Sequence, residues 1–155
     1  MEKQRGFTLL EMMVVVAIIA ILAAILIPNF TRARAQAMTS ACMGNIKTIA
    51  TALELYYTDN QAYPAATNKA VQSLGLAGYL NQTPIDPAAG ASGADYTVTT
   101  TNSGGNGGVA GYQIWCPGTH DPATLTKLNG GTPTTNTTLK YDNQQGYSVV
   151  SAPGS

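Results

Sequence analysis

The feature that most constrains this chain is an uninterrupted apolar run close to its N-terminus. Residues 12–27 contain no charged or polar side chain. With Phe7 as its first residue, the segment 7–27 would form a helix of about 32 Å at about 1.5 Å per residue. That length matches the hydrocarbon core of a bilayer, which is roughly 30 Å thick. Length and composition therefore favour a membrane-spanning helix.

Glu11 is the ionisable residue whose place in this run most needs an explanation. A carboxylate within a span costs on the order of 2.5–3.5 kcal/mol at mid-helix and less near an end, and no lysine or arginine lies between Phe7 and Ile27. Cleavage after Gly6 would create a cationic amine at Phe7, which lies four residues before Glu11 and so on the same helical face. That amine could neutralise Glu11 of its own chain or of a neighbour, which would turn the charge into an assembly signal.

Two other interpretations of the segment explain less of it. The tripeptide at 33–35, Ala-Arg-Ala, suggests the cleavage site of a conventional secretory signal peptide. Arg32 and Arg34 crowd that site, however, and Glu11 gives a signal peptide no advantage. An ordinary membrane anchor accounts for the length of the run but leaves Glu11 without a role.

The stretch Gly6-Phe7-Thr8-Leu9-Leu10-Glu11 resembles the processing site of class III signal sequences, shared by type IV pilins and the pseudopilins of type II secretion. The resemblance implies that residues 1–6 are a leader. A membrane-embedded prepilin peptidase would cut between Gly6 and Phe7 and then N-methylate Phe7. Pro28 also falls where this family commonly has a proline.

By this resemblance the chain is expected to be a filament subunit of a type IV pilus or a type II secretion pseudopilus, not an enzyme, and without a cofactor. It would wait in the inner membrane as a single-pass protein with its C-terminal domain outside the cytoplasm. An inner-membrane assembly platform would then polymerise it, through its N-terminal helix, with itself and other pilins or pseudopilins. Glu11 would meet the Phe7 amine of a neighbour and set the axial register. The alternatives are a membrane-anchored binding module that never polymerises, and a minor tip or DNA-uptake pilin.

After Pro28 the apolar pattern becomes periodic, as in an amphipathic helix. Apolar residues recur at steps of three or four, at positions 35, 38, 42, 46, 49, 53 and 56. The pattern ends at Asp59-Asn60-Gln61 and Pro64. Residues 28–60 are therefore expected to continue the helix of residues 7–27, with Pro28 kinking or locally melting it.

Residues 61–155 are expected to form a globular, β-rich domain that covers the amphipathic stripe. Thr, Gly, Asn and Ser dominate from position 88 onward. The patterns predict a short helix at 68–80, loops at 104–108 and 129–138, and strands at 96–101, 112–116, 138–141 and 147–151. The predicted fold class is α+β, a pilin-like ladle in which a small antiparallel sheet packs on the amphipathic half of the long helix.

Composition and motifs argue against several classes of function. Eight basic and eight acidic side chains, with no basic patch, argue against dedicated nucleic-acid binding. The adjacent pair His120-Asp121 is more typical of a turn than of an acid–base site, so no catalytic residue is assigned.

The two cysteines leave two possibilities open. Cys42 and Cys116 lack the C-x-x-C spacing of structural zinc sites, and the chain has one histidine, so no metal site is expected. A disulfide between them is possible if the domain lies outside the cytoplasm. Two buried free thiols are the alternative.

Overall fold

The computed structural model describes residues 7–88, 95–102, 110–118, 120, 125 and 137–151. The predicted leader with Gly6, the predicted loop at 104–108 and most of the loop at 129–138 lie outside these residues. The chain divides into two compact units, residues 1–34 and residues 35–155.

One long helix, α1 (Leu9–Asn60), contributes to both units. Helical structure continues through Pro28, so the predicted local melting is not seen, and the kink stays a prediction. Proline has no N–H to donate, but the side chains that follow it bond to nearby carbonyls. The Asn29 amide donates to the Ile25 carbonyl (3.3 Å), and the Thr31 hydroxyl donates to the Pro28 carbonyl (2.9 Å).

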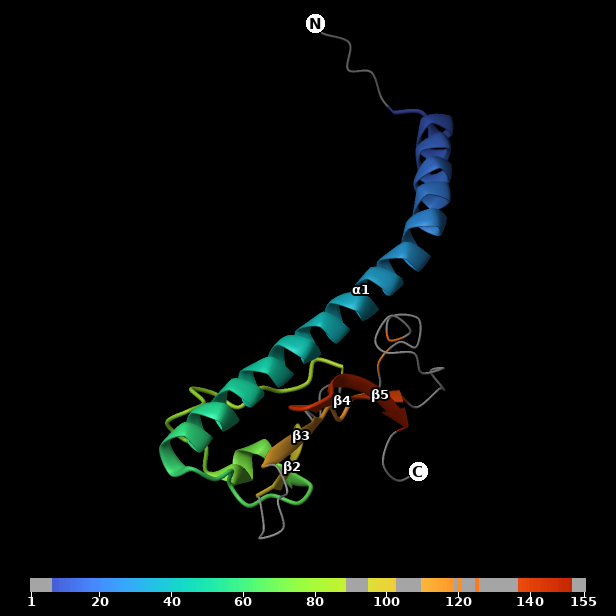
Figure 1. Cartoon of the computed structure of the whole chain (residues 1–155). Coiled ribbons are helices and arrows are strands. Elements are labelled where there is room, and N and C mark those ends of the chain that lie inside the picture. The colour runs from blue at the N-terminus through green and yellow to red at the C-terminus, as the bar shows by residue number, and fades with distance from the viewer. Residues whose placement is uncertain are drawn as a thin grey trace, which may run out of the picture. The chain divides into compact units, whose positions relative to one another are not determined.

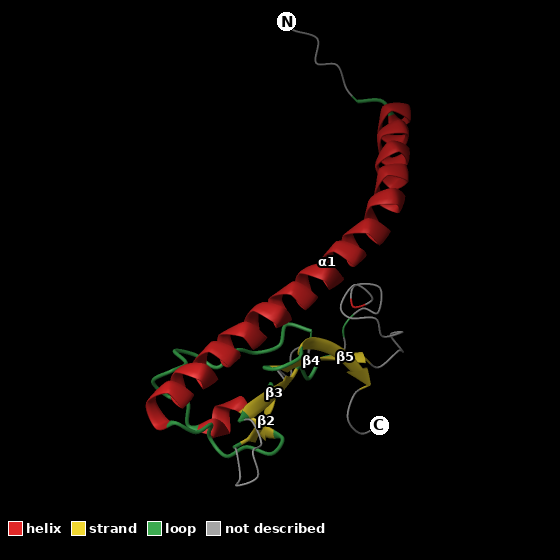
Figure 2. Cartoon of the chain, in the orientation of Figure 1, coloured by secondary structure: helices red, strands yellow, loops and turns green. Residues whose placement is uncertain are grey.

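The second unit contains a five-stranded antiparallel sheet beside the C-terminal part of α1 (Figures 1 and 2). Strand order follows chain order: β1 (Lys69–Ala70), β2 (Thr97–Thr101), β3 (Gly111–Trp115), β4 (Thr137–Asp142) and β5 (Gly146–Ser151). The four predicted strands correspond to β2–β5 within one residue at each end. The predicted α+β class is confirmed.

The prediction of a short helix at 68–80 is wrong except for a single helical turn. Its first residues form β1, which pairs with β2, and only Val71–Leu74 form a helical turn, the 3-10 element η1. Gly75 ends that turn in the left-handed region, at φ +66°, and Gly78 also has a positive φ of +105°. Glycine adopts such angles at little cost, so the chain leaves the helical path where the apolar spacing alone suggested that it would continue.

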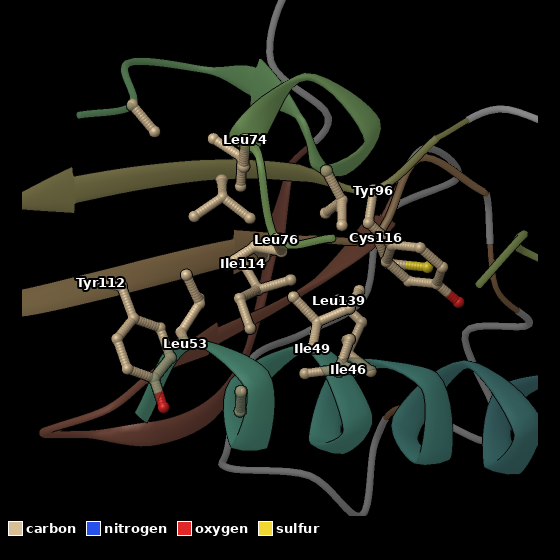
Figure 3. Packing of buried hydrophobic residues seen from close by; sticks show 14 of the residues in the cluster. Ile46, Ile49, Leu53, Leu74, Leu76, Tyr96, Tyr112, Ile114, Cys116 and Leu139 are labelled. Atoms are coloured by element: carbon tan, nitrogen blue, oxygen red, sulfur yellow. The ribbon is translucent and has the colours of Figure 1, made fainter. Parts of the chain in front are cut away.

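The core lies between α1 and the sheet. Ile46, Ile49 and Leu53 are fully buried, and Figure 3 shows them on α1 beneath Ile114 and Leu139 of the sheet. Their spacing of three and four residues is that of one helical face. The predicted stripe is therefore a packed face in this part of α1.

Alternate residues of the strand predicted at 112–116 lie on its buried face. Tyr112, Ile114 and Cys116 are each at most 3% exposed. Cys116 follows directly after β3, so its side chain belongs to the core face at the end of that strand.

Candidate functional site

The first unit presents an extensive apolar surface. Every large apolar side chain between Phe7 and Ile27 is exposed, with exposed fractions between 46% and 78%. Among the described residues one helix is long and apolar enough to cross a membrane, with a mean hydropathy of 3.0 in its most apolar window. Burial of apolar surface stabilises by about 25 cal/mol per Å². A surface of this kind marks an interaction with lipid or with other proteins.

Glu11 lies at the start of this surface and closes a capping box with Thr8. The backbone N–H and the hydroxyl of Thr8 donate to Oε2 of Glu11, at 2.9 and 2.7 Å. The Glu11 N–H lies 3.3 Å from the Thr8 hydroxyl oxygen, which accepts in return. These bonds satisfy N–H groups that a helix end otherwise leaves unpaired. The Thr-x-x-Glu spacing is a sequence signal for a capping box, although no cap was predicted from it.

Phe7 lies outside α1, because the helix begins at Leu9. The predicted placement of Phe7 and Glu11 on one helical face concerns the chain cleaved after Gly6 and stays a prediction. The Glu11 carboxylate nevertheless contacts the backbone of Thr8, the residue directly after Phe7. Phe7 is 74% exposed. The roles of Gly6, Phe7 and Glu11 in processing and register stay predictions.

A different group of ionisable side chains converges inside the second unit. It comprises Cys42 on α1, Asp86 in the loop before β2, Cys116 after β3, and His120. All four residues are buried, with exposed fractions of 0%, 1%, 1% and 5%. One nitrogen, oxygen or sulfur atom from each lies within 4.8 Å of the others. We call these four residues the buried cysteine cluster.

The sulfur atoms of Cys42 and Cys116 meet as a disulfide pair, with their Cα atoms 7.0 Å apart. The sequence alone leaves this pairing open, and the fold brings the two sulfur atoms together. The bond itself stays a prediction. The Cys116 sulfur also lies 3.0 Å from Oδ2 of Asp86 and 2.9 Å from Nε2 of His120.

The Asp86 carboxylate is held by backbone amides. Oδ1 accepts from the Ala88 N–H at 2.9 Å, and Oδ2 accepts from the Gly118 N–H at 2.7 Å. A Cβ atom at Gly118 would collide with this carboxylate, so the close approach requires glycine there. On α1, the Asn45 side chain donates to the carbonyl of Ile85, the neighbour of Asp86, at 3.0 Å.

His120 is oriented from the other side by Thr39 on α1. Nδ1 of His120 lies 3.5 Å from the Thr39 hydroxyl, which itself lies within donating distance of the Ala35 carbonyl, at 3.1 Å. If that hydroxyl proton points to the carbonyl, the oxygen accepts from Nδ1–H, and the lone pair of Nε2 faces Cys116. Burial lowers the pKa of His120, although the nearby Asp86 carboxylate opposes the shift.

The turn expected at His120-Asp121 lies partly outside the described residues, because Asp121 is not among them. In the described part of the chain, His120 is associated with Cys116, Thr39 and Asp86. Sequence reasoning missed Asp86 altogether. Its one signal was the turn-forming stretch around Pro84 and Pro87, which indicates a loop and says nothing about what that loop approaches.

Residues 1–27 match the family described as the prokaryotic N-terminal methylation motif. Among curated proteins, the type II secretion system core protein G of Pseudomonas aeruginosa is 39% identical over 99 residues, which cover 56% of this chain and 69% of the relative. The core protein G of Escherichia coli is 36% identical, over 67% of this chain and 77% of the relative.

A relative named as a pilus component matches over a longer stretch. The type IV wide pilus major component PilA4 of Thermus thermophilus is 35% identical, over 78% of this chain and 86% of the relative. No solved structure matches the chain significantly. Identity of this level, over more than two thirds of each relative, leads to one conclusion. The chain is a member of the type IV pilin and type II secretion pseudopilin family.

Proposed function

We propose that this chain is a structural subunit of a type IV pilus or a type II secretion pseudopilus and that it polymerises through its N-terminal helix. The observation that carries the proposal is the exposed apolar surface of residues 9–27, with Glu11 at its start. The relatives are named as core or major components of such systems, which supports a structural role over a catalytic one.

The apolar surface requires two successive environments in this proposal. Before assembly the bilayer covers it, with the second unit outside the cytoplasm. During assembly an inner-membrane platform transfers the helix into a filament, where the same segments of neighbouring subunits cover one another. Both environments remove apolar side chains from water, so the helix can pass between them without a large hydrophobic penalty.

Processing supplies the charge that Glu11 lacks within the span. We infer that a prepilin peptidase cuts after Gly6 and N-methylates Phe7, which keeps the new amine cationic. The carboxylate of one subunit would then pair with the Phe7 amine of its neighbour. A charge pair in a low-dielectric filament core is favoured only at the correct spacing, so the pair fixes the axial register.

Because Glu11 also closes the capping box, an experiment must separate its role in axial register from its role in capping the helix. Glu11→Gln keeps an acceptor that suits a capping box, since Glu and Gln both occur there, but it removes the charge. We expect Glu11→Gln to abolish filaments as fully as Glu11→Ala does, measured by electron microscopy and by shearing. Glu54→Gln on the same helix is the matched control and should assemble normally. Filaments of normal abundance from Glu11→Gln would overturn the register mechanism.

Processing has a separate test. Intact-mass measurement of the membrane-extracted protein should give a chain that begins at Phe7 and carries one additional methyl group. A Gly6→Leu variant, with a bulky residue at the scissile bond, should retain residues 1–6. A mature chain that begins at Met1 or Gln36 would contradict the proposal.

A further inference from the structure

We propose that the buried cysteine cluster binds a divalent metal ion of the zinc class when Cys42 and Cys116 are thiolates. The site would be four-coordinate, with one ligand atom from each of Cys42, Asp86, Cys116 and His120. Nothing in the family resemblance or in the names of the relatives assigns a metal to these residues. The inference does not depend on the proposed filament function.

The donor set suits zinc. Two thiolate sulfurs, one imidazole nitrogen and one carboxylate oxygen are all common zinc ligands, and a closed four-ligand set is typical of structural sites. Calcium and magnesium prefer oxygen ligands alone. The expectation of no metal site is wrong as a guide here, because it rested on spacing along the chain and on the single histidine, whereas these four candidate ligands come from four separate segments.

Three electron-rich atoms approach one another at the centre of the cluster. The Cys116 sulfur lies 3.0 Å from a carboxylate oxygen of Asp86 and 2.9 Å from Nε2 of His120. A thiol has one proton and can donate to only one of these partners, and a disulfide sulfur has none to donate. A shared cation would satisfy all three atoms at once.

The burial of Asp86 points to the same conclusion. Its carboxylate is 1% exposed, and its backbone donors, the amides of Ala88 and Gly118, are neutral. A buried charge costs several kcal/mol unless an opposite charge lies nearby. A divalent ion at the centre of the cluster would supply that charge, and it would reduce the three negative charges of two thiolates and one carboxylate to one.

The surroundings orient the ligands as in established metal sites, where groups bonded to the ligands fix their direction. Backbone amides hold the Asp86 carboxylate, and Thr39 contacts Nδ1 of His120, so that Nε2 faces the centre. Zinc bonds of about 2.0–2.3 Å place neighbouring ligand atoms roughly 3.5 Å apart in a tetrahedron. The sulfur contacts at 2.9 and 3.0 Å would have to open by less than about 1 Å, and the sulfurs of Cys42 and Cys116 would have to separate once their bond is reduced.

The test uses the full chain in detergent, with its cysteines reduced by a metal-free phosphine, titrated with Co²⁺ as the probe. We expect one equivalent to bind and to give the thiolate-to-cobalt charge-transfer absorption and the intense visible bands of tetrahedral cobalt. Added Zn²⁺ should displace the cobalt and remove both signals. A reduced, folded chain that shows neither signal would overturn the proposal.

Variants identify the ligands without removing the cysteines. Asp86→Asn and His120→Ala should weaken or abolish the tetrahedral cobalt spectrum, whereas Asp59→Asn, at an exposed carboxylate of α1, should leave it unchanged. Far-UV circular dichroism checks that each variant is folded. If Asp86→Asn and His120→Ala bind cobalt with the wild-type spectrum and affinity, the four-ligand site is excluded.

A variant at Thr39 tests the site even if the ligand variants Asp86→Asn and His120→Ala fail to fold. Thr39→Val keeps all four ligands and removes the hydroxyl that contacts His120, so cobalt affinity should fall about 10–100-fold. Thr48→Val is the matched control, since Thr48 lies on the same helix and its hydroxyl likewise donates to the carbonyl four residues earlier. Equal affinities for these two variants would contradict the assigned orientation of His120.

Discussion

The two halves of α1 use apolar side chains in opposite ways. From Leu9 to Ile27 the large apolar side chains are exposed on every side of the helix, and no other described part of the chain covers them. From Cys42 to Leu53 the apolar residues are confined to one face, and that face is buried against the sheet. Continuous apolarity therefore indicates a partner outside the chain, whereas periodic apolarity indicates a partner within it.

The largest effect should come from truncating the same residue type in each half. Ile49→Ala should destabilise the second unit by about 2–5 kcal/mol, because it removes fully buried methyl groups and leaves a cavity. Ile18→Ala should leave that stability unchanged, since Ile18 is 53% exposed. Denaturant unfolding of the detergent-solubilised chain, followed by tyrosine fluorescence, measures both. Equal losses would show that the two halves do not differ in this way.

A smaller effect should follow from removing the cap at the start of the helix. Thr8→Ala deletes the hydroxyl that bonds Glu11 and should cost about 0.5–2 kcal/mol of local stability. Amide hydrogen exchange at Glu11 and Met12 should become correspondingly faster. Thr51→Ala is the control, because the Thr51 hydroxyl donates only to the Lys47 carbonyl within an already formed helix. If exchange at Glu11 is unaltered in Thr8→Ala, the capping box does not stabilise this end.

An effect confined to alkaline pH concerns Tyr63, whose hydroxyl contacts a carboxylate in the other half of the helix. Glu54 lies 3.3 Å from the hydroxyl of buried Tyr63, and burial followed by the Glu54 charge raises the pKa of Tyr63 to about 12. Unfolded tyrosine titrates near pH 10. The folded chain therefore keeps a proton that the unfolded chain releases, and stability present below about pH 10 is lost as the pH rises through about 12.

Tyr63→Phe tests this linkage. The variant should show a shallower loss of unfolding free energy between about pH 10 and 12 than the unmodified chain. Denaturant unfolding at a series of alkaline pH values measures the two slopes. Identical slopes would mean that Tyr63 does not contribute to the alkaline loss.

Much of the fold was predictable because its signals are local. Alternation placed Tyr112 and Ile114 on the buried face of β3, and the helical period placed Ile46 and Leu53 on the buried face of α1. The segment at 68–80 was mispredicted because Val71 and Leu74 have a spacing that fits a helix and a single 3-10 turn equally well.

The buried cysteine cluster was not predictable from one sequence. Asp86 and Cys116 are separated by 30 residues, and Thr39 and His120 by 81, so no local period relates them. Only the packing of α1 against the end of β3 brings them together. Glu11 is the opposite case, because its capping partner lies three residues away and Thr-x-x-Glu is readable directly.

The strand order has a consequence for how the domain is completed during synthesis. Each strand pairs antiparallel with the one before it, so the sheet can grow in chain order without a crossover. The last strand, however, reaches back to the helix, where the Tyr147 hydroxyl donates to the Met43 carbonyl 104 residues earlier. A nascent chain that lacks β5 would expose β4 as an open edge, which is prone to pairing with other chains. Arrival of the final strand pairs β4 and moves the open edge to β5, which the Tyr147 hydroxyl ties to α1.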